Sequence, residues 1–184
     1  LSMQFLLGMI LNGAQGSTAA EICSVLGYGD GEIEDVNQFC QNMLEQLPKL
    51  DKQTTLSMAN AIFVDEGWPL KDSYKATVGK AYNAKLASLD FSKGAASAKV
   101  INRWCSDQTH GMIDKVLETT DPAMLCYLLN ALYFKSQWKE KFNKGNTVDE
   151  AFTDELGNKS TVKIMKLNKS FSYQQNDVFK IVRL

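Results

Sequence analysis

Residues 123–142 restrict the possible folds of this chain more than any other stretch. Residues 123–134 are apolar apart from the amide of Asn130, and the polar segment that follows carries Trp138 and Phe142. The run is apolar at positions of both parities, as in a strand covered on both faces. It is too short to cross a bilayer as a helix. We therefore predict a long central strand of a large sheet over residues 123–135.

Asn130 is the residue of this strand that needs a special explanation. A buried amide must be hydrogen-bonded, because leaving it unpaired costs about 1–3 kcal/mol. In the middle of an apolar strand, its partners must come from neighbouring elements. Taken alone, Asn130 is interpreted as a structural polar bridge, and Trp138 as a packing residue.

The rest of the hydrophobic pattern predicts helices interspersed with strands. Helices are expected over residues 1–12, 17–26, 33–47, 70–82 and 95–110. Strands are expected over residues 54–64, 84–91, 161–167, 171–174 and 178–184. The order is not a regular alternation of strand and helix, so the predicted fold class is α+β.

Two segments also allow predictions of burial. Residues 1–12 are apolar nearly all round, which predicts a helix buried on all sides. Strand 54–64 carries apolar residues of both parities, which predicts cover on both faces. In the helix over residues 95–110, four side chains are expected to face the core: Val100, Ile101, Trp104 and Cys105.

Composition excludes several classes of function. The formal net charge is −1, the pI is about 5.9 and the basic residues are scattered, so no nucleic-acid partner is expected. No stretch is long enough for a membrane span, and no cofactor motif is present. The four cysteines lack paired short spacing, so neither a metal site nor any cofactor is expected; free buried thiols are favoured over disulfides. Both ends of the sequence lie in apolar segments, which predicts that it is part of a longer protein.

The sequence contains few residues that could form a catalytic site. The chain has one histidine, His110, so a Ser-His-Asp or Cys-His arrangement would have to use it. His110 falls at a predicted helix end, where a cation is favourable without any catalytic role. The sequence predicts a protein that is not an enzyme, with a hydrolase using His110 as the alternative.

Several blocks of the sequence resemble the serpins, a family of protease inhibitors. Residues 130–142 are similar to a serpin signature in which an Asn is followed by Phe-Lys-Gly-x-Trp-x-x-x-Phe, with Ser136 in place of the glycine. Further matching blocks follow in the family's order at residues 1–18, 58–64, 101–113 and 152–165. The resemblance implies helices packed around a large mixed main sheet, with further short-stranded sheets.

The resemblance also implies roles for individual residues. Ser2 and Asn130 would belong to the shutter, a polar cluster under the centre of the main sheet. Trp138 would belong to the breach, where the reactive loop first enters that sheet. The strand edge that receives the loop would carry Met124, Cys126, Leu128, Leu132 and Phe134. The reactive bond itself would lie outside this sequence.

The function implied is that of a suicide-substrate inhibitor of a serine protease, with a cysteine protease as the other target class. A non-inhibitory carrier or chaperone of the same family is the alternative. Residues 1–184 would form a partial domain that lacks the first helix, the fifth main-sheet strand and the reactive loop. A second chain or segment is therefore expected to complete the fold. By the same resemblance, the protein is expected to be secreted or extracytoplasmic.

Overall fold

A computed structural model describes residues 1–29 and 31–183 of the chain. The chain divides into two compact units, Leu1–Lys135 and Ser136–Leu184. The first unit contains a mixed sheet and all the α-helices described, whereas the second contains two short two-stranded sheets. Helices and mixed strands together make an α+β protein, as predicted.

The sheet of the first unit has the strand order β2-β1-β3. Its strands are β1 (Thr55–Asp65), β2 (Ala84–Leu89) and β3 (Cys126–Lys135). Strand β1 runs parallel to β2 and antiparallel to β3, which is why the sheet is mixed. The predicted strands 54–64 and 84–91 are thereby confirmed.

The third predicted strand begins later than expected. Residues 121–124 form a turn in which the Met124 amide donates to the Asp121 carbonyl at 3.1 Å, so Met124 lies outside β3. The apolar character of residues 123–125 suggested strand, but the Asp121-Pro122 pair starts a turn here. Placing Met124 on the insertion-edge strand was therefore wrong.

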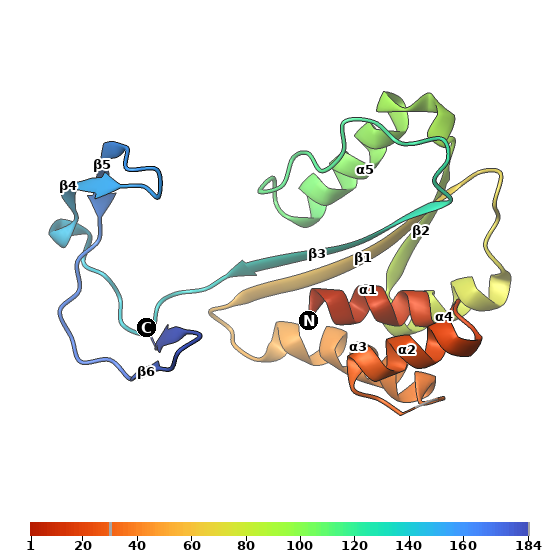
Figure 1. The fold of residues 1–184 in the computed structure, drawn as a ribbon, viewed down its shortest axis with the longest axis horizontal. Helices are drawn as coiled ribbons and strands as arrows, with labels where there is room; N and C mark the ends of the chain where they lie inside the picture. The colour runs from red at the N-terminus through yellow and green to blue at the C-terminus, as the bar shows by residue number, and fades with distance from the viewer. Residues whose placement is uncertain (30, 184) are drawn as a thin grey trace. The chain divides into compact units, whose positions relative to one another are not determined.

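The helices lie on both faces of this sheet (Figure 1). They are α1 (Ser2–Leu11), α2 (Gly16–Leu26), α3 (Ile33–Gln46), α4 (Asp72–Tyr82) and α5 (Ala95–Gln108). Short 3-10 turns follow α3 at Leu47–Lys49 and β2 at Phe91–Lys93. Helices α1 to α4 gather on one face and α5 crosses the other.

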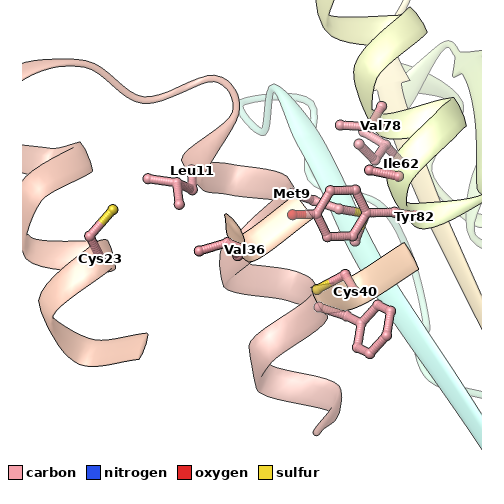
Figure 2. Packing of buried hydrophobic residues seen from close by; sticks show 10 residues of the cluster. Met9, Leu11, Cys23, Val36, Cys40, Ile62, Val78 and Tyr82 are labelled. Carbon is pink, nitrogen blue, oxygen red and sulfur yellow. The ribbon is translucent and has the colours of Figure 1, made fainter. Parts of the chain in front are cut away.

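Strand β1 separates two apolar clusters because its side chains alternate between the two faces. Ile62 points into the cluster formed with α1 to α4, where Tyr82 lies among Met9, Val36 and Cys40 (Figure 2). Phe63 points into the second cluster, where its ring meets Trp104 of α5 edge-on at 6.2 Å between centroids. The predicted cover of both strand faces is confirmed.

Two predictions of burial were wrong. Helix α1 buries Phe5, Met9 and Leu11, but Met3 is 64% exposed and Ile10 is also exposed. In α5, Val100 is exposed, while the other three predicted core residues are buried. Apolar periodicity predicts which residues can be buried, but among the described residues no element covers these positions.

The second unit is made of short strands with mostly exposed side chains. A 3-10 turn at Lys144–Asn146 precedes β4 (Val148–Thr153), which pairs antiparallel with β5 (Lys159–Ile164). Strand β6 (Tyr173–Gln175) pairs antiparallel with β7 (Lys180–Val182). The sequence predicted the last three of these strands approximately but did not delimit β4, in which three of the six residues are polar.

All four cysteines are free, and three of them are buried, as expected. Cys40 is fully buried in the helical cluster, and desolvation raises the pKa of its thiol to about 11. A thiol attacks alkylating reagents as the thiolate, so an inaccessible and protonated Cys40 should react poorly.

We expect native protein at pH 8 to leave Cys40 unmodified by iodoacetamide, while denatured protein is modified at all four cysteines. Mass spectrometry of peptides from both samples measures this difference.

The raised pKa of Cys40 also predicts that the protein loses stability in alkali. Its contribution is complete below the unfolded pKa of about 9 and is lost as pH rises to about 11, because the unfolded thiol ionises first. In the labelling experiment, equal modification of Cys40 in native and denatured protein would contradict its burial.

Candidate functional site

The centre of the sheet carries two paired asparagines. Asn130 of β3 lies directly opposite Asn60 of β1, and its Nδ2 donates to Asn60 Oδ1 at 2.8 Å. Asn60 is only 2% exposed, and its own Nδ2 donates to the backbone carbonyl of Tyr82 at 2.7 Å. The predicted polar bridge at Asn130 is therefore present, and its partner is Asn60.

Sequence reasoning missed Asn60, although a signal was present. Asn60 is the single polar residue in the segment from Met58 to Val64, just as Asn130 is in the run over residues 123–134. One amide in each of two neighbouring apolar strands is a pattern that predicts a hydrogen-bonded pair across the strands.

Asn130 retains one unsatisfied group. Its Oδ1 is buried, and no hydrogen-bond donor reaches it among the residues that the structure describes. A buried acceptor without a partner costs about 1–3 kcal/mol. Within the described residues, the edge of β3 that faces away from β1 also has no partner strand. The middle of β3 thus presents an unused side-chain acceptor beside an unpaired backbone edge.

The polar contacts continue from the sheet into the helices. The Tyr82 hydroxyl donates to Asn37 Oδ1 of α3 at 2.7 Å. Asn37 and Asn12, which follows α1, exchange two hydrogen bonds: Asn12 Nδ2 donates to Asn37 Oδ1 at 2.7 Å, and Asn37 Nδ2 donates to Asn12 Oδ1 at 3.0 Å. Burial raises the pKa of Tyr82, so its hydroxyl remains a donor.

Ser2 and Trp138 lie in different units of the chain. Ser2 is the first residue of α1, and no hydrogen bond joins it to Asn130 or Asn60 within the described part of the chain. Trp138 belongs to the second unit, is 52% exposed, and packs its ring edge-on against Phe142 at 6.2 Å between centroids. Their shutter and breach roles remain predictions.

The remaining residues predicted for the insertion edge do share one face of β3. Cys126 and Leu128 pack against the helical cluster, whereas Leu132 and Phe134 are exposed near the end of the strand. Side chains on the opposite face, such as Leu129, pack against the α5 cluster. The strand is therefore packed on both faces over its first half. In its second half, Ala131 is still buried against the α5 cluster, whereas Leu132 and Phe134 on the other face are exposed.

His110 sits in a structural setting rather than beside a nucleophile. It follows α5 with φ 52°, and its ring meets Tyr133 edge-on at 4.4 Å between centroids. In residues 1–29 and 31–183, no hydrogen bond or ion pair joins it to a serine, cysteine or carboxylate. A base without a nucleophile or an orienting acid within reach is not a triad.

Membrane-spanning helices and metal-binding clusters are both absent from the described residues. None of the helices found there is long and apolar enough to cross a membrane. No group of three or more His, Cys, Asp or Glu side chains in that part of the chain is arranged to hold a metal ion.

Comparison with known sequences gives consistent matches. A family model described as "Serpin (serine protease inhibitor)" matches residues 1–184. The chain is 37% identical over 157 residues to Serpin B6 of Bos taurus, covering 83% of the chain and 42% of that relative. It is 33% identical over 175 residues to leukocyte elastase inhibitor A of Mus musculus, covering 94% of the chain and 46% of that relative. The chain thus spans less than half the length of these relatives.

Solved structures match over nearly the whole chain. The native stressed conformation of Arabidopsis AtSerpin1 aligns with TM-score 0.85 at 29% identity, covering 98% of this chain and 47% of that one. Emu ovalbumin (Dromaius novaehollandiae) aligns with TM-score 0.81 at 25% identity, covering 98% of this chain and 51% of that one.

The relatives also correct one expectation. Serpin B6 and the leukocyte elastase inhibitors are intracellular members of their family, so the prediction of a secreted or extracytoplasmic protein was wrong. That prediction rested on the resemblance alone.

The family match extends over every residue of the chain, and the fold agrees with it independently of sequence identity. The aligned part is the N-terminal half of the domain, which contains the sheet centre at Asn130. The chain belongs to the serpin family of protease inhibitors.

Proposed function

We propose that this chain forms the N-terminal half of an inhibitory serpin that traps a serine protease by inserting its cleaved reactive loop beside β3. The observation that supports this most directly is the family match over residues 1–184, which includes the Asn130–Asn60 pair at the centre of the sheet.

In the proposed mechanism, the reactive loop lies outside these residues and is attacked as a substrate. The protease serine oxygen bonds to the carbonyl carbon of the scissile peptide, the peptide C–N bond breaks, and the new amine takes up a proton. The ester that remains ties the protease to the loop. Insertion of the loop then carries the protease with it before water can hydrolyse the ester.

The contribution of this chain is the receiving edge. Backbone groups at the edge of β3 that faces away from β1 would pair with the incoming strand. Asn130 and Asn60 would form the polar shutter, because hydrogen bonds can hold a sheet closed and still be exchanged when it opens. Ser2 in the shutter and Trp138 in the breach are parts of the same proposal.

The names of the relatives suggest where to look for the target. Leukocyte elastase inhibitors of Mus musculus and Sus scrofa are 33% identical to this chain, so elastase-type serine proteases come first. Cysteine proteases form the second group to be tested.

The test is to mix the intact protein with a panel of serine and cysteine proteases. We expect an adduct of inhibitor and protease that survives SDS, because the ester is covalent. The same protease inactivated at its catalytic serine with phenylmethylsulfonyl fluoride should give no adduct.

Cleavage by every protease without any adduct would overturn the inhibitory function and favour the carrier or chaperone alternative. The His110→Ala variant should form the adduct normally. If the intact protein instead showed hydrolytic activity that this substitution removes, the hydrolase alternative would be supported.

A further inference from the structure

A continuous chain of hydrogen bonds connects the helices with the centre of the sheet. It runs from Asn12 to Asn37, Tyr82, Asn60 and Asn130, and successive partners are separated by 25, 45, 22 and 70 residues in the sequence. Among these five residues, Tyr82 alone contributes both a side-chain and a backbone group, its hydroxyl toward α3 and its backbone carbonyl toward β1. It is therefore the link between the two halves of the network.

The sheet half of the network consists of Tyr82, Asn60 and Asn130. In it, the Tyr82 carbonyl determines which group donates and which accepts in each hydrogen bond. The Tyr82 carbonyl can only accept, so Asn60 must turn its Nδ2 toward it and its Oδ1 toward β3. Asn130 must then donate its Nδ2 to Asn60, which leaves its Oδ1 as the free acceptor. The position of the Tyr82 backbone thus determines which group Asn130 offers to the next strand.

The helix half of the network is fixed in the same way. Asn12 Nδ2 donates to the Gly8 carbonyl at 2.8 Å, and this orients the reciprocal pair with Asn37. The Tyr82 hydroxyl then meets Asn37 Oδ1 as its acceptor. The ring has no space to move toward α1, since a Cβ at Gly8 would lie 2.5 Å from the Tyr82 hydroxyl oxygen.

We propose that Asn12, Asn37 and Tyr82 are positioning residues that orient Asn60 and, through it, Asn130, and so control how easily the edge of β3 opens for insertion. This inference rests on the proposed function, since it assigns a control of the same strand edge. Helix α3 and the end of α1 then help to hold the sheet closed. None of these three residues contacts the incoming strand in this mechanism.

The chain contains a matched pair of tyrosines for testing this. Tyr82 and Tyr74 both lie in α4, and each hydroxyl bonds to a partner on a neighbouring helix, since the Tyr74 hydroxyl donates to the Met9 carbonyl at 3.0 Å. Only Tyr82 continues to Asn60. Tyr82→Phe and Tyr74→Phe each remove one hydroxyl from α4, but only the first cuts the network. Tyr82 is fully buried and also accepts from Asn12 Nδ2 at 3.4 Å, whereas Tyr74 is half-buried.

The experiment measures hydrogen exchange of the β3 backbone amides, residues 126–135, in the intact protein and both variants. Losing the net stabilisation by one hydrogen bond changes the equilibrium constant for local opening about fivefold. We expect Tyr82→Phe to exchange β3 amides about fivefold faster than wild type, and Tyr74→Phe to change them less than twofold. Amides of β2 should change little in either variant.

Equal effects of the two variants on β3 would overturn the inference, as would an equal rise over the whole sheet in Tyr82→Phe. A second measurement separates control of the sheet from general stability. If the sheet opens more easily, it also accepts the uncut loop, so Tyr82→Phe should lose inhibitory activity on standing about fivefold faster than Tyr74→Phe. If the intact wild type forms no adduct with any protease, the proposed function fails, while the exchange comparison still decides the role of Tyr82.

Discussion

We expect the Trp104→Ala variant of the intact protein to have a free energy of unfolding about 3–5 kcal/mol lower than the wild type. Trp104 is 6% exposed and packs against Phe63 in the cluster that joins α5 to β1. Alanine removes the whole indole from a site enclosed by strand and helix. The variant therefore loses the hydrophobic stabilisation from burying the indole and also bears the cost of the cavity that remains. Equilibrium unfolding in urea, followed by circular dichroism, measures the change.

The matched control is Trp68→Ala. Trp68 lies in the turn after β1 and is 61% exposed, so its removal should change the free energy of unfolding by no more than about 0.5 kcal/mol. A loss below about 1 kcal/mol in Trp104→Ala would show that α5 is held to the sheet by other contacts.

The elements that could be predicted from the sequence are those with a local periodic signal. Strand β1 was predicted with its two faces correctly divided, because alternation of apolar residues is a property of adjacent positions. The start of β3 could not be predicted from apolar character, because the turn over residues 121–124 is set by backbone geometry. Exposure of Met3 was also not predictable, since it depends on which elements cover α1.

The candidate site was predicted only in part, for a different reason. Asn130 stands out because its neighbours in the sequence are apolar. Asn12 and Asn37 have polar or helical surroundings that fit a solvated position equally well, yet Asn37 is buried. Their partners lie 25 or more residues away, so their roles become visible only when the fold brings the amides together.

The second large effect is expected for Asn60→Ala. This substitution removes the donor to the Tyr82 carbonyl and the acceptor for Asn130 Nδ2, leaving two polar groups unpaired at the centre of the sheet. Each buried group without a partner costs about 1–3 kcal/mol, and partial relaxation suggests a total of about 2–4 kcal/mol. Urea unfolding of the intact protein gives the free energy, and the rate of activity loss on standing gives the effect on the sheet.

Two other asparagine-to-alanine variants show whether the loss of stability in Asn60→Ala comes from the network or from losing any one amide. Asn130→Ala leaves only Asn60 Oδ1 unpaired and also removes the unsatisfied Asn130 Oδ1, so it should cost less, about 1–2 kcal/mol. Asn42→Ala deletes an amide that bonds to Gln38 on the surface of α3, and should cost about 0.5 kcal/mol or less. If Asn130→Ala proved more costly than Asn60→Ala, then Asn130 would depend on contacts other than Asn60, and the orientation of its amide would not be set from Tyr82.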